Sequence, residues 1–287
     1  LGDSIQLFDL ISSLREKYGQ NNIFYLSAHK NHFNNALQDY NIKINDLKTE
    51  ISYFGFRLWH FLSSKRKLLS KNSIEKFDLI IDLQSKLRNT LILKQIPNRH
   101  FYSSTLNFKF CSTHKDYIST KYDNNNIILN LEKLLNDKIV FRKYDTNLID
   151  SKYFTEAKRL LPDSNYIGFS ITQGNAYRKK SWPIEKFLSV ANKILKQNKI
   201  PVFFIERNNI DLINKIKNEI QNVLIPELDS NLSGPPLVTA LSKRLEKAIS
   251  IDNGIMHMIG LANIPMTVLF GPTNSKKFSP KIKNINI

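Results

Sequence analysis

ISIDNGIMHMIG, residues 249–260, joins two apolar patterns through an acid, an amide and a glycine. Before the junction, Ala248–Ile251 is short and rich in β-branched residues, as a buried strand would be. After it, Ile255, Met256 and Ile259 recur at helical spacing. The junction Asp252–Gly254 admits two interpretations. It can be only a helix N-cap, or it can point free amide groups and the positive end of a helix dipole at a bound anion.

The alternation of strand and helix runs along the whole chain. In the second half, strands are predicted at 166–171, 202–205, 223–225, 248–251 and 266–270, with helices at 183–197, 210–220, 237–247 and 255–261. In the first half, strands are predicted at 22–26 and 77–83, with helices at 4–18, 32–40, 50–71 and 86–95. This order predicts two α/β domains with mostly parallel sheets, residues 1–150 and 151–287, joined in the polar stretch 145–164.

Composition excludes several classes. The 287 residues contain one cysteine, Cys111, so an internal disulfide and a cysteine-based metal site are both excluded. No apolar run approaches the roughly 20 residues that span a bilayer, and the opening LGDSIQLFDL lacks the pattern of a signal peptide. We therefore expect a cytoplasmic protein. Ligands of α/β domains bind beyond the carboxyl ends of the strands, so a cleft between the two domains is the expected site.

The formal net charge of +17 raises the question of nucleic acid. The basic residues are 32 lysines and 10 arginines, and they are spread over both halves of the chain. A dedicated DNA reader more often concentrates its charge and uses arginine for base contacts. An anionic membrane surface or a phosphorylated acceptor explains the charge equally well. A basic nucleic-acid-binding α/β protein is kept as the third interpretation, and no nucleic-acid partner is expected.

Four segments carry a resemblance. They are Leu1-Gly2-Asp3, the segment IDLQSKLRNTL at 81–91, SITQGNAYRKKSWP at 170–183, and Asp252-Asn253-Gly254 with His257, followed by FGPT at 270–273. In this order they resemble the heptosyltransferases of glycosyltransferase family 9. Two positions differ from the family pattern: Asn253 stands where the family has threonine, and Gln173 where it has proline.

The resemblance implies a GT-B fold, in which two Rossmann-like domains face each other across a cleft. The N-terminal domain would bind the acceptor, and the C-terminal domain the nucleotide sugar. The strand that normally precedes Leu-Gly-Asp and the usual closing helices are both missing from the sequence, so we expect a fragment or a diverged member.

The activity implied by the resemblance is an inverting, metal-independent transfer of heptose, or a related sugar, from an ADP-sugar to the inner core of lipopolysaccharide. No cofactor is expected, and the partners are a sugar nucleotide and an anionic lipid-linked saccharide at the inner membrane surface. Two alternatives remain: a glycosyltransferase that uses a different sugar nucleotide, and a protein that binds nucleotide sugars without turnover.

On this resemblance the catalytic base is Asp3, whose alternative role is the N-cap of the first helix. The leaving diphosphate would be met by Lys180, otherwise a solvated charge, and by the loop residues Asn175 and Ala176. Asp252 would accept hydrogen bonds from the donor sugar. The remaining donor-site residues are Asn253, Gly254 and His257, the last of which could equally be a core histidine.

The acceptor side is assigned to three residues that could meet phosphate or acidic sugar groups, namely Arg57, Gln84 and Arg88. Glu206 and Asp211 are both candidates for the carboxylate that contacts the nucleotide ribose. These residues follow the predicted strand 202–205, where α/β domains place ligand contacts.

Overall fold

The computed structural model describes residues 2–27, 31–50, 55–69, 71, 74–84, 86–112, 122, 126–173 and 181–287. The chain forms two compact units. Unit 1 consists of residues 1–8, 36–42 and 144–287, and unit 2 of residues 9–35 and 43–143. Two short N-terminal segments therefore belong to the same unit as the second half of the chain. The assignment of acceptor and donor roles to domains 1–150 and 151–287 stays a prediction.

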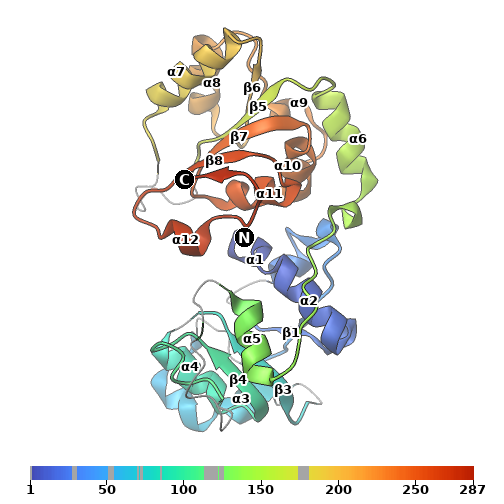
Figure 1. Ribbon diagram of the computed structural model, residues 1–287, viewed down its shortest axis with the longest axis vertical. Coiled ribbons are helices and arrows are strands. Elements are labelled where there is room, and N and C mark those ends of the chain that lie inside the picture. The colour runs from blue at the N-terminus through green and yellow to red at the C-terminus, as the bar shows by residue number, and fades with distance from the viewer. Residues whose placement is uncertain are drawn as a thin grey trace. The chain divides into compact units, whose positions relative to one another are not determined.

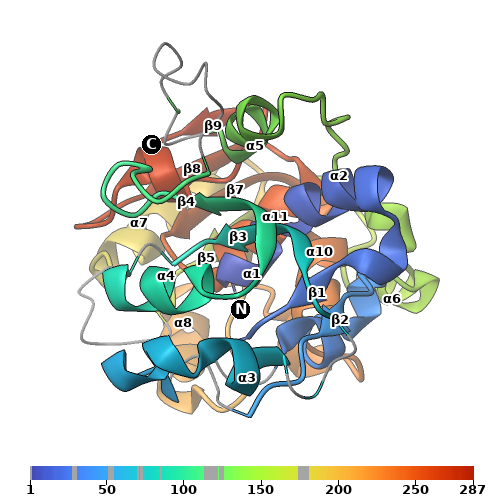
Figure 2. The same ribbon diagram turned by 90° about the horizontal axis from the view of Figure 1, so that it is seen from below.

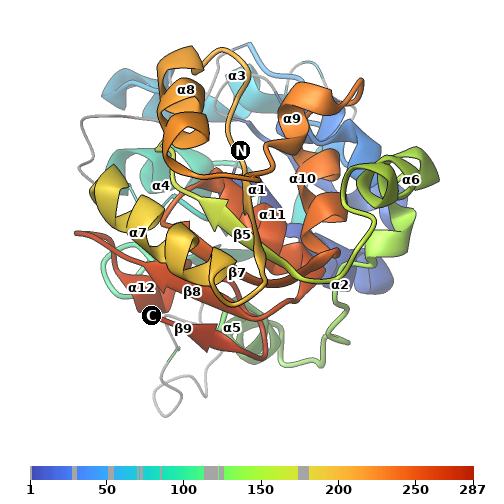
Figure 3. The same ribbon diagram turned by 90° about the horizontal axis from the view of Figure 1, so that it is seen from above.

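Unit 1 is a doubly wound α/β structure. Its strands are β5 (Tyr166–Ser170), β6 (Ile200–Phe203), β7 (Leu245–Ile251), β8 (Met266–Leu269) and β9 (Ile285–Asn286). Its helices are α1 (Gly2–Ile5), η3 (Gln38–Tyr40), η7 (Thr146–Leu148), α6 (Ser151–Leu160), α7 (Ile184–Leu195), α8 (Ile210–Glu219), α9 (Pro226–Asp229), α10 (Pro235–Ser242), α11 (Gly254–Ala262) and α12 (Ser275–Phe278). Figure 1 shows α7 and α8 on one side of the sheet and α10 and α11 on the other, and Figure 3 gives the second view.

The strand order of unit 1 locates its binding edge. All pairs in the described sheet are parallel, in the order β6-β5-β7-β8-β9. A further bridge from Val202 to Leu224 adds a segment beyond β6. In chain order this is 3-2-1-4-5-6, the order of a Rossmann fold, whose topological switch point lies between its first and fourth strands. In this chain those strands are β5 and β7.

The core of unit 1 explains why these segments form strands and helices. Every residue of β5 is buried, as expected for a central parallel strand with helices on both faces. Phe169 of β5 stacks on Phe203 of β6 with ring centroids 4.7 Å apart. Phe187 of α7 and Ile216 of α8 complete the same cluster from the helical layer. The amphipathic spacing of α7 and α8 therefore covers one face of the sheet.

Unit 2 is built around two parallel strand pairs. Its strands are β1 (Phe24–Tyr25), β2 (Asn45–Asp46), β3 (Phe77–Asp82) and β4 (Asn98–Ser103). Its helices are α2 (Phe8–Tyr18), which starts in unit 1, η1 (Gln20–Asn22), η2 (His32–Asn34), η5 (Leu58–Leu62), α3 (Ser64–Leu69), α4 (Leu87–Lys94) and α5 (Ile127–Leu135). Strand β1 pairs with β2 and β3 with β4, and Figure 2 shows β3 and β4 side by side. A hydrophobic cluster around Phe56, Leu68, Ile92 and Phe101 forms a core that joins β3 and β4 to α3 and α4.

The fold class predicted from the sequence is confirmed, but several elements differ. The polar stretch 145–164 contains α6, because Tyr153 and Ala157 form a narrow buried stripe on an otherwise polar helix. The helix predicted at 237–247 ends at Ser242, and its last residues belong to β7. The region 50–71 contains two short helices, η5 and α3, in its described part rather than one long helix. The helix predicted at 32–40 is two separate 3₁₀ turns.

Candidate functional site

The switch point of unit 1 is held together by Asn253. Its side-chain oxygen accepts a hydrogen bond from the backbone N–H of Met256 at 2.9 Å, which makes it the N-cap of α11. Its side-chain nitrogen donates to the Ser170 hydroxyl at 2.7 Å and to the Thr172 carbonyl at 2.8 Å. Threonine could cap the helix but has no second donor for β5. Asparagine at this position therefore has a structural role, because its amide links the end of β7 to the end of β5.

Asp252 and Gly254 flank this amide at the carboxyl end of β7. Asp252 is only 6% exposed, and Gly254 is the first residue of α11. Because Asn253 caps only the N–H of Met256, the first N–H groups of α11 keep the positive end of the helix dipole next to the switch point. The cap interpretation is confirmed, with Asn253 as the capping residue, and the binding of an anion at this junction stays a prediction.

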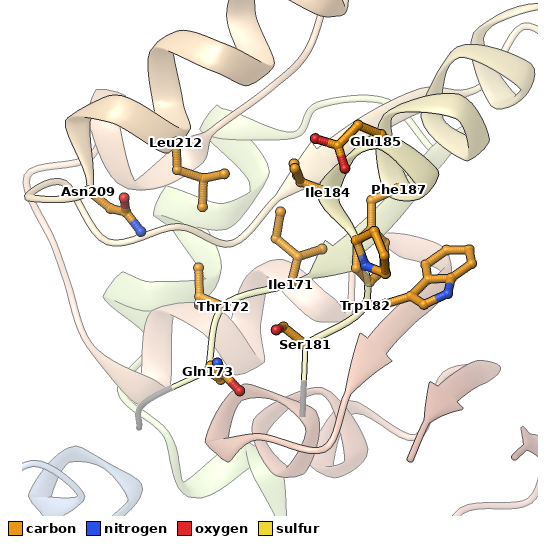
Figure 4. Close-up of a pocket in the computed structure, with 11 residues that line it drawn as sticks. Ile171, Thr172, Gln173, Ser181, Trp182, Ile184, Glu185, Phe187, Asn209 and Leu212 are labelled. Carbon is orange, nitrogen blue, oxygen red and sulfur yellow. The ribbon is translucent and has the colours of Figure 1, made fainter. Parts of the chain in front are cut away.

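A pocket of about 590 Å³ adjoins the same edge. Ile171, Thr172 and Gln173 line it from the end of β5, and Trp182, Glu185 and Phe187 line it from the start of α7. Asn209 and Leu212, at the start of α8, form the opposite wall, as Figure 4 shows. Thr172 lines the pocket, and its backbone carbonyl accepts the hydrogen bond of Asn253, so the pocket and the junction share this residue.

The N-terminal motif reaches the same junction through α1. A Cβ atom on Gly2 would lie 2.9 Å from Cδ2 of His257 and 3.1 Å from Cα of Gly254. Only glycine allows the two backbones to come this close. One turn later, the Gln6 amide nitrogen lies 2.9 Å from Nε2 of His257. This contact links the end of α1 to the first turns of α11.

The structure shows the surroundings of two predicted site residues, His257 and Asp3. His257 is 8% exposed and packs against α1, so the core interpretation holds for its surroundings, and its contact with a donor stays a prediction. Asp3 is exposed and lies within the first turn of α1, so it does not precede the helix as an N-cap would. Asp3 follows Gly2 in the sequence, and its role as the catalytic base stays a prediction. Gln6, Ser170 and Thr172 were missed because no local pattern marks them.

Three donor-site residues, Asn175, Ala176 and Lys180, lie outside the described residues. Both ribose candidates are described and exposed. Glu206 follows β6, and its backbone carbonyl accepts the N–H of Asn209, while Asp211 lies in the first turn of α8. A further carboxylate, Glu227 of α9, was not predicted. Burial raises its pKa, the nearby Arg207 guanidinium lowers it, and the Glu206 carboxylate raises it further.

The predicted acceptor residues all lie in unit 2. Gln84 and Arg88 are exposed at the end of β3 and the start of α4, and Arg57 is exposed directly before η5. Gln84 donates its backbone N–H to the buried Asp82 carboxylate, and Arg88 donates to the side chain of Asn89. The structure thus brings Gln84 and Arg88 to one edge of unit 2, while their role stays a prediction.

Two kinds of feature are absent from the part of the chain that the structure describes. None of the described helices combines the length and the apolar run that would carry it across a bilayer. The described histidine, cysteine, aspartate and glutamate side chains include no group of three or more that could hold a metal ion.

Comparison with protein families decides the identity. The profile of glycosyltransferase family 9 (heptosyltransferase) matches residues 65–287, more than half of the chain. The chain belongs to glycosyltransferase family 9. It is therefore a glycosyltransferase with an α/β fold of the GT-B type. No curated protein matches the sequence.

Solved structures agree with this family 9 fold. The family 9 glycosyl transferase from Veillonella parvula DSM 2008 matches with a TM-score of 0.64 and 18% identity, covering 99% of this chain and 83% of that one. The E. coli heptosyltransferase WaaC with ADP matches with a TM-score of 0.63 and 13% identity, over 99% and 89%. The E. coli ADP-heptose lipopolysaccharide heptosyltransferase II matches with a TM-score of 0.57 and 16% identity, over 99% and 86%. At these identities the likeness concerns the fold.

Proposed function

We propose that this glycosyltransferase transfers heptose, or a closely related sugar, from an ADP-sugar to an anionic lipid-linked saccharide of the lipopolysaccharide inner core. The observation that carries the proposal is the junction of β5 and β7, where Asn253 joins the two strand ends beside Asp252 and the N-terminus of α11. An ADP-sugar needs a site of this composition: amide groups and a helix end for the diphosphate, and a carboxylate for sugar hydroxyls.

The donor is proposed to occupy the pocket and the junction together. The nucleoside would lie in the pocket of about 590 Å³, which has the size of a small-molecule site. Glu206 or Asp211 would accept from the ribose, and Gly254 would let a phosphate approach closely because it has no Cβ. ADP as the nucleotide is supported by the solved relatives, since WaaC was crystallised with ADP and with ADP-2-deoxy-2-fluoro heptose.

The chemistry is proposed to be an inverting displacement without a metal. The acceptor hydroxyl loses its proton to the Asp3 carboxylate as it attacks the anomeric carbon, and the bond to the diphosphate breaks. Lys180 neutralises the charge that develops on the leaving ADP. Gly2, by its contact with Gly254 and His257, would hold Asp3 at the donor junction.

The test is the thermal stability of the protein with ADP, UDP or GDP. A ligand that binds only the native state raises the free energy of unfolding by about 2.7 kcal/mol when its concentration is 100 times its Kd. Of the three nucleotides, ADP should therefore raise the melting temperature most. Lys180→Ala should lose much of this protection, because a charge-assisted contact to phosphate contributes roughly 1.5–3 kcal/mol. Lys179→Ala is the matched control and should lose little.

Each outcome discriminates between functions. Protection by UDP or GDP instead of ADP contradicts the proposed donor. Protection by ADP without sugar transfer indicates a binding protein without turnover. Equal losses from Lys180→Ala and Lys179→Ala indicate a diffuse basic patch and contradict the role of Lys180.

A further inference from the structure

An apolar surface is exposed on unit 2, far along the chain from the donor junction. In η5 the exposed fractions are 69% for Leu58, 71% for Trp59, 40% for Phe61 and 91% for Leu62. We call these four residues the η5 patch. Large apolar side chains adjacent on the surface mark an interaction site more often than chance exposure.

The local helix explains why these side chains point outward. A 3₁₀ helix has three residues per turn, so every third residue lies on one side. His60 takes the inward side at 7% exposed, and its Nδ1 accepts the N–H of Arg57 at 3.1 Å. The neighbouring core is already filled by Phe56 and Leu68, both fully buried. The η5 patch is therefore a second apolar face and not part of the core.

His60 anchors this arrangement in its neutral form. Burial lowers the pKa of His60, and the nearby charges of Lys67 and Arg57 lower it further. The imidazole therefore keeps a lone pair with which it accepts the Arg57 N–H at neutral pH. The Ser63 N–H in turn donates to the His60 carbonyl at 3.1 Å, which closes η5 and leads into α3.

Positive charge surrounds the η5 patch. The sequence from Arg57 to Lys71 contains five basic residues and no acidic residue. Arg57, Lys65 and Lys71 are exposed, and Lys67 is half-buried. One acidic residue, Glu50, lies next to this stretch, because its backbone N–H donates to the Lys67 carbonyl. Exposed apolar side chains with lysine and arginine beside them are complementary to a partner whose interior is apolar and whose surface carries negative charge.

We propose that the η5 patch inserts into the headgroup region of an anionic lipid bilayer. Trp59 takes the interfacial position that indole rings prefer, and the leucines reach the acyl boundary. The flanking cations contact acidic headgroups. A second copy of this chain fits less well, because the approach of two molecules that each carry +17 would bring the basic frames together.

This bilayer contact concerns the side of the enzyme that is proposed to bind the acceptor. It depends on the proposed function only for the identity of the lipid that carries the acceptor. Helix α4 contacts η5, and its first turn exposes Leu87 and Arg88. A bilayer at η5 would therefore present the saccharide of a lipid-linked acceptor to the edge of unit 2 that carries Arg88 and Gln84.

The experiment measures binding to vesicles of equal parts phosphatidylcholine and phosphatidylglycerol, with pure phosphatidylcholine as the neutral control. The chain has two tryptophans, so Trp182→Phe leaves Trp59 as the only indole. On addition of acidic vesicles, its emission should shift to the blue and be quenched by brominated lipid. Binding should fall steeply as salt rises, because the attraction acts within a Debye length of about 10 Å at 0.1 M.

The variant Leu58→Ser/Leu62→Ser should bind acidic vesicles at least about tenfold more weakly, since each inserted leucine contributes through its buried area. Its melting temperature should be unchanged, because both side chains are exposed. Ile210→Ser is the matched control: Ile210 is 62% exposed in unit 1 and is followed by Asp211. This control should bind as the wild type does.

Three results would overturn the inference: equal vesicle binding by the double variant and the control, an unshifted Trp59 emission, or self-association that the double variant abolishes while vesicles have no effect. The last result would identify the patch as a contact between copies. The ADP thermal shift is read separately on protein that keeps Trp182, because Trp182 lines the proposed donor pocket. A missing ADP shift with Trp59-dependent vesicle binding rejects the proposed donor and leaves the bilayer contact standing.

Discussion

Two strand ends in this molecule share almost the same local sequence and differ in their connection to the next helix. The segment Ile81-Asp82-Leu83 spans the end of β3, and Ile251-Asp252-Asn253 spans the end of β7. Both aspartates are buried, at 2% and 6% exposed. Helix α4 starts only at Leu87, well after Asp82, whereas α11 starts at Gly254, two residues after Asp252. Only the second connection brings a helix N-terminus directly to the strand end.

The partners of Asp82 show how unit 2 uses its carboxylate. The Thr90 hydroxyl donates to it at 2.5 Å, the Ser103 hydroxyl at 2.9 Å and the Gln84 N–H at 3.0 Å. These donors come from α4, β4 and the β3–α4 loop, so Asp82 joins three parts of the unit. The same residue type at the carboxyl end of a strand thus supports folding in unit 2, while in unit 1 it is proposed to bind the donor sugar.

The largest expected effect tests whether the β5–β7 junction is catalytic. Asp3→Asn should lower turnover by about 10²–10⁴-fold, because the amide cannot accept the acceptor's proton. Stability should change little, since Asp3 is exposed in the first turn of α1. The measurement is sugar transfer from ADP-heptose, together with the ADP thermal shift.

Asp9→Asn is its control, because Asp9 also lies in the first turn of a helix, α2. Its turnover should stay close to that of the wild type. Transfer by Asp3→Asn at the wild-type rate would show that the base lies elsewhere.

Next in size is the paired substitution that compares the two strand ends directly. Asp82→Asn should cost about 2 kcal/mol of unfolding free energy, because buried donors lose charge-assisted bonds. Asp252→Asn should instead weaken ADP-sugar binding by about tenfold or more, with a smaller loss for ADP, because its proposed partner is the sugar. Chemical denaturation and ligand titration measure the two effects.

Asp78→Asn controls for position on β3, since Asp78 is exposed on the same strand. It should change stability by less than about 0.5 kcal/mol. If Asp252→Asn loses only stability and Asp82→Asn only affinity, the two roles have been assigned the wrong way round.

A smaller effect isolates the bond between the strand ends. Asn253→Thr keeps a capping oxygen but has one donor in place of two, so it loses at least one of the hydrogen bonds to Ser170 and Thr172. This variant should cost about 1–2 kcal/mol of unfolding free energy and weaken ADP binding. Asn126→Thr is the matched variant, because Asn126 caps α5 through the Leu129 N–H. Thermal denaturation measures the stability loss of each variant. Asn253→Thr should lose more than Asn126→Thr, by the contribution of the hydrogen bonds to Ser170 and Thr172. Equal losses would show that Asn253 acts only as a helix cap.

The smallest effect concerns a surface contact of unit 1 away from both strand ends. Hydrogen bonds from Arg159 and then Ser230 lower the pKa of Glu156 from 4.5 to about 2. A lowered carboxyl pKa contributes stability that is fully present above pH 4.5 and is lost as pH falls towards 2. Arg159 is 56% exposed, so solvent screening reduces the contribution to about 0.5–1 kcal/mol.

Glu156→Gln should therefore lower the unfolding free energy at pH 7 and leave it nearly unchanged near pH 2. Unfolding at a series of pH values measures this difference. A pH-independent loss would assign the effect to packing of the side chain rather than to its charge.

Much of the fold could be predicted because its signals are local. The strands at Tyr166–Ser170 and Met266–Leu269 are short apolar runs, and helix α7 has a clear 3.6-residue period. Helix α6 was missed because two buried residues, Tyr153 and Ala157, leave it polar overall. Strand β4, NRHFYS, was missed because its first residues are polar and partly exposed at the start of the strand.

For the site, sequence determined the motifs and their order, and tertiary structure decided what they do together. The pattern of Asp252, Asn253 and Gly254 is enough to predict a strand-to-helix junction, since caps and periodicity act within a few residues. The hydrogen bonds of Asn253 to Ser170 and Thr172, and the contact of Gly2 with His257, join residues 81 to 255 positions apart. Such partners are set by the strand order of the sheet and by backbone approach, which no local pattern encodes.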